Sequence, residues 1–283
     1  MAAALATAVA VALLTPHEKA ALVVVSGQPA PVGVGGVLIQ PATRHEPRPW
    51  GSLVFADQEG GPIRAFRDLP PFRAASTYAN AEDAFAAGRE TAAALRRLGV
   101  DVDLAPVVDL PDGPLGSRQF ADPQFALAFA RALGRHACVK HFPGLGTLPI
   151  STDERLRVYG HVRERDLAPF AAAIRAGVRC VMVGHGIYPE LGPRRAVIER
   201  ATYRLLRAKL RFRGVIITDS MGVLGDDGPR YGVEAIRAGA DLVLFTSPSQ
   251  AIDAERRLVP LARRGLLDEH VARVLALRRL LHR

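Results

Sequence analysis

The stretch GVIITD, residues 214–219, decides the fold class because its side chains are apolar on both faces until the final aspartate. The stretches LVVVS at 22–26 and DLVLFT at 241–246 share this pattern. Strands of this kind are typical of a parallel sheet covered by helices, whereas strands of an antiparallel sandwich alternate apolar and polar residues. The sequence therefore predicts an α/β protein.

Similar runs recur along the whole chain and are separated by helical patterns. The predicted strands are 22–26, 36–40, 53–57, 101–108, 138–141, 180–185, 215–219 and 242–246. The predicted helices are 80–98, 123–134, 166–176, 201–212, 232–238 and 268–281. Eight strands that alternate with helices predict a (β/α)₈ TIM-type barrel, and we expect a single domain over residues 1–283.

An open doubly wound sheet is the structural alternative, because the same alternation of strands and helices builds it. A dinucleotide-binding sheet usually has a G-x-G-x-x-G turn between its first strand and a helix. Here the glycine-rich segment at 32–37, VGVGGV, precedes a predicted strand. The barrel is therefore the preferred prediction.

The formal net charge of +9 raises the possibility of nucleic-acid binding. Almost all of the basic residues are arginines, since lysine occurs only at positions 19, 140 and 209. The arginines are spread over predicted helices, with no aromatic residues interleaved as a stacking platform. We expect solvated helix faces and no nucleic-acid partner.

The two cysteines lie in apolar runs, Cys138 in HACVKHF and Cys180 in RCVMVGH. Neither has metal-ligand spacing to a second cysteine or histidine, so we expect two buried thiols. We expect no metal and no cofactor. The apolar N-terminal stretch lacks the basic start of a secretory signal, and residues 16–19 (PHEK) interrupt it before it is long enough to span a membrane. We expect a helix start at Thr15, no membrane span and a cytoplasmic location.

Ionisable residues end several predicted strands. They are Asp57, Asp109, Lys140, His141, His185 and Asp219. Each alone has an ordinary structural explanation, since an aspartate after a strand often caps a helix. In a barrel, however, the carboxyl ends of the strands surround one active site. Gathering these charges at one mouth is costly without a polar ligand, so the set favours a polyol or anionic substrate.

The segments that carry these residues resemble, in order, the motifs of glycoside hydrolase family 3. They are FADQEGGPIRAF at 55–66, LGVDVDLAPVVDLPDGPLGSRQFADP at 98–123, KHFPGLG at 140–146 and RFRGVIITDSMGV at 211–223. The similarity extends from about residue 16 to about residue 246 and is greatest to bacterial β-N-acetylglucosaminidases that trim peptidoglycan fragments. The resemblance implies a retaining β-glycosidase that acts on N-acetylglucosamine-type sugars.

The resemblance also assigns roles to individual residues. Asp57, Arg118, Lys140 and His141 would bind the hydroxyls of the sugar, and Asp219 would be the nucleophile that forms a covalent glycosyl-enzyme intermediate. His185 would contact the substrate or support the surroundings of Asp219. A small carbohydrate is the expected partner, and we expect a monomer.

The sequence departs from this family pattern at its acid catalyst. Leu145 replaces the second histidine of K-H-F-P-G-H-G, and no histidine lies between His141 and His161. Asp153 is the preferred replacement as acid/base, with Glu154 on the same loop as the alternative. The other possibilities are a substrate with a good leaving group, transfer to an acceptor other than water, or a sugar-binding pseudoenzyme.

Two further observations complete the predictions. The segment GPRRAVIERATYR at 192–204 replaces a Pro-Ala-Ser type turn of the family, so the loop there is expected to differ. A phosphate-handling barrel is a third functional class, but the sequence after the predicted seventh strand, GDDGPR, is acidic and lacks a glycine-rich phosphate turn.

Overall fold

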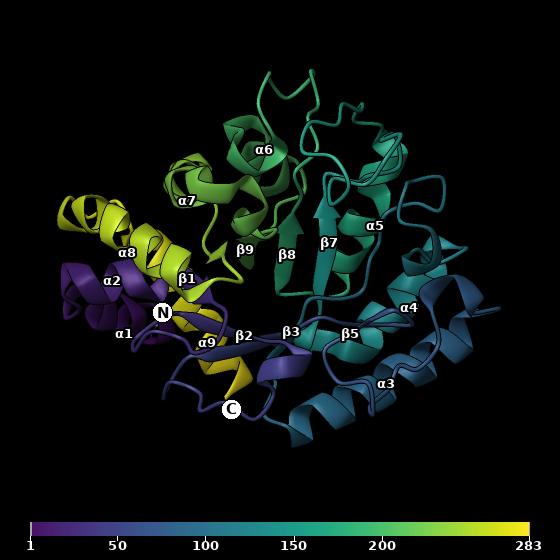
Figure 1. Cartoon of the computed structure of the whole chain (residues 1–283), viewed down its shortest axis with the longest axis horizontal. Helices are drawn as coiled ribbons and strands as arrows, with labels where there is room; N and C mark the ends of the chain where they lie inside the picture. The colour runs from purple at the N-terminus through teal and green to yellow at the C-terminus, as the bar shows by residue number, and fades with distance from the viewer. Residues whose placement is uncertain (1, 283) are drawn as a thin grey trace.

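Parallel strands that curl around a common interior form the centre of the computed structural model, which describes residues 2–282 (Figure 1). One sheet has the order β10-β1-β2-β3-β6 and the other has the order β7-β8-β9. The strands of these two sheets are β1 (Val24–Ser26), β2 (Gly36–Ile39), β3 (Leu53–Ala56), β6 (Val102–Asp103), β7 (Cys138–Phe142), β8 (Cys180–Val183), β9 (Val215–Thr218) and β10 (Val243–Leu244). Each predicted strand is confirmed, with shorter bounds in most cases.

The two sheets meet at both of their edges through isolated parallel bridges. Asp103 pairs with Ala137 beside β7, and Ile217 of β9 pairs with Leu242 beside β10. Because every pair in both sheets is parallel, the carboxyl ends of the strands face the same way. Functional groups that follow different strands are therefore brought to one end of the molecule.

Alternate residues of the strands face opposite sides of the sheet, and both sides are buried. Val25 and Ile217 belong to an interior cluster with apolar residues of the other strands, whereas Val24 and Ile216 pack in the layer beneath the helices. This arrangement explains why the strands lack polar alternation. The class prediction of an α/β protein with a parallel sheet is confirmed.

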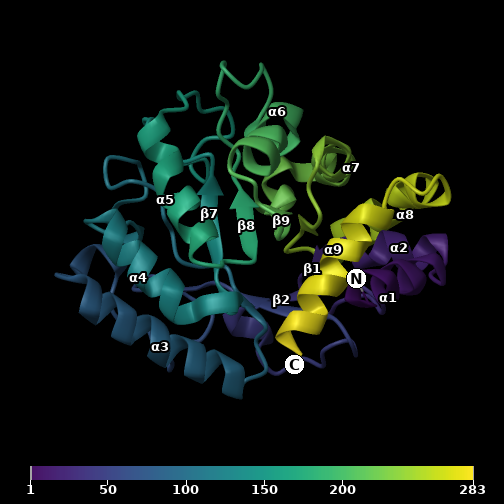
Figure 2. The ribbon, with the colours of Figure 1, turned by 180° about the vertical axis from the view of Figure 1, so that it is seen from behind.

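Helices cover the outside of the sheet, as the two opposite views show (Figures 1 and 2). Their bounds are α1 (Ala2–Ala12), α2 (Pro16–Leu22), α3 (Ala81–Arg97), α4 (Pro123–Leu133), α5 (Glu164–Arg175), α6 (Arg200–Arg204), α7 (Gly228–Ala238), α8 (Pro248–Arg263) and α9 (Asp268–Leu281). The predicted start at Thr15 is confirmed: its Oγ1 accepts from the Glu18 backbone N–H, and Glu18 Oε2 accepts from the Thr15 N–H. No helix among residues 2–282 combines the length and apolarity needed to cross a membrane.

The alternation of strand and helix is incomplete in the first quarter of the described chain. The connections from β1 to β2 and from β2 to β3 contain no α-helix. Both are rich in proline, with Pro29 and Pro31 in the first connection and Pro41, Pro47 and Pro49 in the second. Proline removes a backbone donor and clashes with the preceding turn of a helix, so helices are disfavoured in these connections. The expectation of alternation from end to end is wrong for this region.

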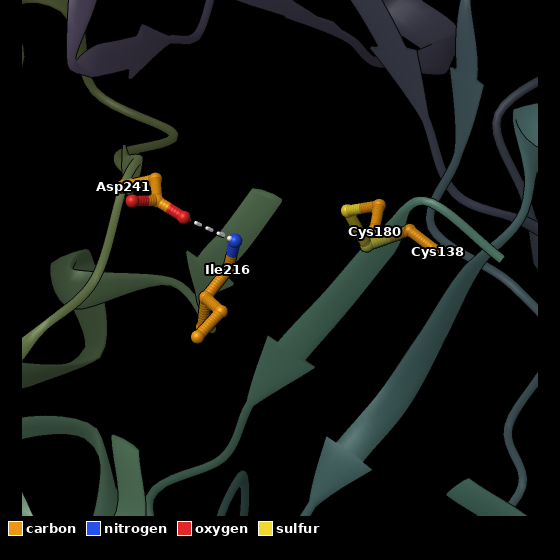
Figure 3. Close-up of a disulfide and its surroundings, with 4 residues drawn as sticks. All are labelled: Cys138, Cys180, Ile216 and Asp241. Carbon is orange, nitrogen blue, oxygen red and sulfur yellow. Dashed lines mark hydrogen bonds between the residues drawn. A yellow bond between two sulfur atoms is a disulfide. The ribbon is translucent and has the colours of Figure 1, made fainter. Parts of the chain in front are cut away.

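Helix α9 closes the end of the sheet opposite the strands' carboxyl ends. Its Val274, Leu277 and Leu281 join the interior cluster. Its Arg273 Nε donates to Oδ1 of Asp241, at 2.7 Å. Asp241, fully buried just before β10, also accepts from the backbone N–H of Ile216 at 2.8 Å (Figure 3). This carboxylate therefore joins α9 to two neighbouring strands.

The two cysteines form a disulfide between β7 and β8 (Figure 3). Cys138 and Cys180 are paired in register on these adjacent parallel strands, and both side chains face the interior cluster. Their Cα atoms lie 4.3 Å apart, close enough for a disulfide bond. The prediction of two free thiols is wrong, although both residues are buried as expected. Sequence separation concealed the pair, because only the strand register brings residues 42 positions apart into contact.

Candidate active site

A polar cavity of about 180 Å³ lies at the carboxyl ends of the strands. Its ionisable lining comes from β7 itself and from segments that follow β3, β6, β7 and β9. These residues are Asp57, Glu59, Arg118, Lys140, His141, Asp153 and Asp219. Six of them are predicted site residues, so the fold brings together groups that lie up to about 160 positions apart in the chain.

Lys140 is the central cation of the cavity. Its Nζ lies 2.6 Å from Oδ1 of Asp57 and 2.6 Å from Oε1 of Glu59. The Lys140 side chain is only 3% exposed, so the ammonium depends on these carboxylates for compensation. Burial alone would lower the pKa of Lys140, but Asp57 and Glu59 outweigh burial and raise it. Lys140 is therefore a permanent donor.

Glu59 connects Lys140 to Arg118. The guanidinium donates from Nε to Oε2 and from Nη2 to Oε1, both at 2.8 Å, in a bidentate pair. Burial would raise the pKa of Glu59, but Lys140 and Arg118 together lower it to about 2. The carboxylate is thus ionised at neutral pH and fixes two cations that face the cavity.

A short antiparallel hairpin of β4 (Gln58–Gly60) and β5 (Ile63–Arg64) positions Glu59. The turn needs glycine: Gly60 has φ 109° and Gly61 has φ 53°, values that side chains disfavour. A Cβ on Gly60 would also lie 2.4 Å from the carbonyl oxygen of Arg73. The EGG sequence therefore permits the tight turn that directs Glu59 under the cavity.

Asp109 orients His141 from beneath the cavity. Its Oδ2 accepts from the His141 backbone N–H at 3.0 Å and contacts ring Nδ1 at 2.8 Å. Its Oδ1 accepts from the backbone N–H of Leu145 at 2.9 Å. With Nδ1 engaged by a carboxylate, Nε2 is the ring atom available to a ligand. Leu145, at the position of the family histidine, is buried in the hydrophobic core.

Asp219 follows β9 and lies half-buried at the cavity. Its Oδ1 accepts from the Ser220 backbone N–H at 2.7 Å. Burial would raise the pKa of Asp219, but His141, His185 and the Ser220 N–H outweigh it and lower the pKa. The carboxylate is therefore ionised at neutral pH, as a nucleophile must be.

His185 does not line the cavity but supports the loop that carries Asp219. Its Nε2 lies 2.9 Å from the carbonyl oxygen of Ser220, so Nε2 carries the proton. Burial lowers the pKa of His185, which favours the neutral ring. Nδ1 is buried and has no hydrogen-bond partner within residues 2–282. Of its two expected roles, the structure favours support over substrate contact.

Asp153 lies on the long connection after β7 and lines the cavity. Its side chain is 62% exposed, and Oδ2 lies 3.3 Å from Nη1 of Arg118. Glu154, the alternative acid, is exposed and is not among the residues that line this cavity. Asp153 is therefore the better placed of the two loop carboxylates.

Glu59 is the site residue that the sequence prediction omitted. It lies two positions after Asp57 within FADQEGG, on a hairpin instead of at the end of a barrel strand. The rule that active-site groups follow strand ends therefore did not select it. The available signal was the pair of glycines that follows it, which indicates a turn beside a strand end.

Comparison with known proteins places the chain in a family. Residues 39–277 match the model of the glycosyl hydrolase family 3 N terminal domain. A β-hexosaminidase of Stenotrophomonas maltophilia (strain K279a) is 37% identical over 238 residues, which cover 74% of this chain and 70% of the relative. Another β-hexosaminidase, from Xanthomonas oryzae pv. oryzae (strain KACC10331 / KXO85), is 36% identical over 260 residues, covering 78% of this chain and 77% of the relative.

Solved structures are similar over almost the whole chain. A glycoside hydrolase family 3 β-N-acetylglucosaminidase from Paenibacillus sp. str. FPU-7 has a TM-score of 0.82 and 26% identity, over 95% of this chain and 64% of that one. A β-N-acetylhexosaminidase from Beutenbergia cavernae DSM 12333 has a TM-score of 0.75 and 26% identity, over 94% and 98% of the two chains. The family resemblance of the motifs is confirmed, and the chain belongs to glycosyl hydrolase family 3.

Proposed function

We propose that the protein is a retaining β-N-acetylhexosaminidase that hydrolyses terminal N-acetylglucosamine-type residues. Asp219 is the nucleophile, Asp153 is the acid/base, and no metal or cofactor takes part. The observation that carries the proposal is that Asp219 and Asp153 line one cavity together with Asp57, Arg118, Lys140 and His141, the residues predicted to bind the sugar. The β-hexosaminidase names of relatives at 36–37% identity support the same activity.

The sugar ring is held by groups with complementary hydrogen-bonding capacity. Asp57 accepts hydrogen bonds from hydroxyls, while Lys140, Arg118 and His141 donate to them. Because Lys140 and Arg118 are fixed by the buried Glu59, they are oriented before the sugar binds. This preorganisation reduces the entropy that binding must overcome.

The reaction proceeds in two displacements. The Asp219 carboxylate attacks the anomeric carbon, and the bond to the leaving-group oxygen breaks as that oxygen takes the proton of Asp153. Asp153 then removes a proton from water, whose oxygen attacks the anomeric carbon and releases Asp219. Two inversions give net retention of configuration. Asp153 must exchange its contact with Arg118 for the leaving group, which its exposed position on a long connection permits.

A sugar-binding protein without turnover is the second candidate function. The observation that favours it is Leu145, which buries an apolar side chain where the family acid catalyst's motif has histidine. General acid catalysis typically contributes about 10²- to 10⁴-fold to the rate. If Asp153 does not act as an acid, only activated glycosides would turn over measurably.

The experiment measures turnover of a panel of aryl N-acetyl-β-glucosaminides by wild type, Asp219→Ala and Asp153→Ala. We expect Asp219→Ala to abolish turnover. We expect Asp153→Ala to lose most of its kcat/KM on poor leaving groups and to keep it on good ones. On good leaving groups its kcat should fall because the second displacement lacks a base, and azide should restore this kcat by replacing the activated water. Sugar binding by wild type without turnover of any panel member would favour the binding protein instead.

The control variant is Glu154→Ala, which removes the neighbouring exposed carboxylate. It should retain wild-type rates on every member of the panel, because Glu154 does not line the cavity. If Glu154→Ala loses activity that azide restores, and Asp153→Ala keeps the wild-type rate, the acid/base role belongs to Glu154.

We further propose that residues 1–283 form one domain, a monomeric (β/α)₈-type barrel whose first three strands are joined by loops. The bridges at both edges of the two sheets support closure of the barrel. The Cys138–Cys180 disulfide favours an oxidising compartment over the cytoplasm that the sequence predicted.

A further inference from the structure

A second, larger pocket lies on the same side of the molecule as the cavity that Asp57, Lys140 and Asp219 line, which we call the sugar cavity. Its volume is about 370 Å³, and its lining comes from the segments after β7 and β8 and from α7, which follows β9. Four arginines line it: Arg157, Arg194, Arg195 and Arg230. Arg194 and Arg195 belong to GPRRAVIER, the segment that departs from the family pattern. We call this site the arginine pocket.

Two of these arginines are compensated by carboxylates. Arg194 Nη1 lies 3.3 Å from Oε2 of Glu234, and Arg230 Nη1 lies 2.9 Å from Oε1 of the same residue. Glu199 and Asp227 lie near them as well, at 3.5 Å from Arg194 and 3.2 Å from Arg230.

The other two arginines, Arg157 and Arg195, form no ion pair with a carboxylate within residues 2–282. Arg157 donates to the hydroxyl of Tyr159 at 3.1 Å. Arg195 Nη1 is buried and has no hydrogen-bond partner in that part of the chain. A buried guanidinium donor without an acceptor costs free energy, which an incoming anion would recover. The pocket therefore contains an unsatisfied donor and two uncompensated positive charges.

Local contacts place the pocket beside the catalytic groups. Ile187, which lines it, lies two positions after His185 and is paired with Arg195 across the loop. His185 in turn contacts Ser220, the residue after Asp219.

We propose that the arginine pocket binds an oxyanionic group, a carboxylate or a phosphate, next to the sugar cavity. Arginine forks match the planar geometry of such oxygens. Arg195 supplies the unpaired donor, and Arg157 adds an exposed positive charge with no carboxylate partner in the described chain. The anion is either a substituent on the leaving group of the glycoside or a free inorganic anion. Binding of an anionic leaving group rests on the proposed function, whereas binding of a free anion does not.

The first arm of the test measures binding without turnover. Inorganic phosphate is titrated at constant ionic strength while the melting temperature is recorded for wild type, the double variant Arg157→Ala/Arg195→Ala and the control Arg256→Ala. Arg256 is exposed on α8, outside both cavities. We expect phosphate to raise the melting temperature of wild type and the control, and not that of the double variant.

The second arm compares kcat/KM for aryl glycosides whose leaving group carries a carboxylate or its neutral amide. We expect wild type to prefer the carboxylate and the double variant to lose at least about tenfold of that preference. The rate on the neutral amide should be unchanged. If the double variant does not fold, Arg157→Gln and Arg195→Gln are measured singly.

The outcomes distinguish the two possible sources of the anion, and they distinguish the anion site from the proposed glycosidase function. A phosphate effect without a carboxylate preference identifies a free anion as the occupant, and the reverse identifies the leaving group. Absence of all turnover with the phosphate effect retained defeats the proposed function and leaves the anion site standing. The absence of both effects in wild type, or their persistence in the double variant, would overturn the proposal.

Discussion

Asp109 holds His141 through two atoms at once: its Oδ2 accepts from the backbone N–H at 3.0 Å and contacts the ring Nδ1 at 2.8 Å. The carboxylate is fully buried, and its other oxygen accepts from Leu145. His141 is therefore fixed in position, backbone and ring together, by a residue that does not line the cavity. We therefore propose Asp109 as a positioning residue for the sugar binding that is proposed for His141.

Asp109→Ala is expected to lower kcat/KM by about 10- to 100-fold, because a small displacement of a substrate-positioning group has effects of this size. The measurement is a double-mutant cycle with His141→Ala on an aryl N-acetyl-β-glucosaminide. In the His141→Ala background, loss of Asp109 should cost little more. Additive losses in the double variant would show that Asp109 acts independently of His141.

Glu59→Gln is expected to destabilise the protein by about 3 kcal/mol at neutral pH, because it leaves two buried cations without their shared carboxylate. The folded-state pKa of Glu59 is lowered from 4.5 to about 2. A lowered pKa stabilises the fold above about pH 4.5, and this contribution is lost as the pH falls toward 2. Chemical unfolding at several pH values measures both effects.

The variant should lack this part of the acid dependence, so wild type and Glu59→Gln should converge in stability as the pH falls from 4.5. Glu82→Gln, an exposed substitution on α3, is the matched control and should follow wild type at every pH. A constant difference between wild type and Glu59→Gln across this range would contradict the assigned pKa.

Asp241→Ala is expected to reduce stability by about 3 kcal/mol while kcat/KM stays at the wild-type value. The carboxylate binds Arg207, Arg273 and the backbone of Ile216 at the end of the sheet opposite the active site. Its removal leaves these groups unpaired without changing the cavity. The free energy of unfolding and kcat/KM are measured on one preparation to test whether stability falls without loss of activity. A large loss of kcat/KM in the folded variant would contradict this prediction.

The Cys138–Cys180 pair is expected to yield no reactive thiol when the protein is unfolded in denaturant without reductant. After reduction, two thiols per chain should react. Thiol titration with a chromogenic reagent makes the measurement on protein prepared under oxidising conditions. Two reactive thiols before reduction would restore the prediction of free cysteines.

The sequence was most informative where the pattern is periodic or where the residues in contact are close together in the chain. The strands were recognisable from runs such as GVIITD because burial on both faces leaves only apolar residues. Asp219 and Lys140 were recognisable as site residues because each ends such a run. The capping box at Thr15 was also predictable, since Thr15 and Glu18 contact each other within one helical turn.

Contacts that depend on tertiary register were not predictable in the same way. The disulfide requires that β7 and β8 align Cys138 with Cys180, which no local pattern encodes. Glu59 belongs to the site because the hairpin of β4 and β5 brings its carboxylate to Lys140, although Glu59 does not itself end a strand of the barrel. No α-helix separates the first three strands, because their connections are rich in proline. The count of eight strands alone did not show that strands could follow one another here without a helix.

The central claim is that Asp219 is the nucleophile of a retaining glycosidase. The most direct measurement incubates wild type with an activated fluorinated N-acetylglucosaminide that forms a slowly hydrolysed glycosyl-enzyme, followed by intact-mass analysis and peptide mapping. We predict one added glycosyl group per chain, located on the peptide that contains Asp219 and absent from Asp219→Ala. An active wild type that carries the label on another carboxylate would contradict the claim. Turnover retained by Asp219→Ala would also contradict it.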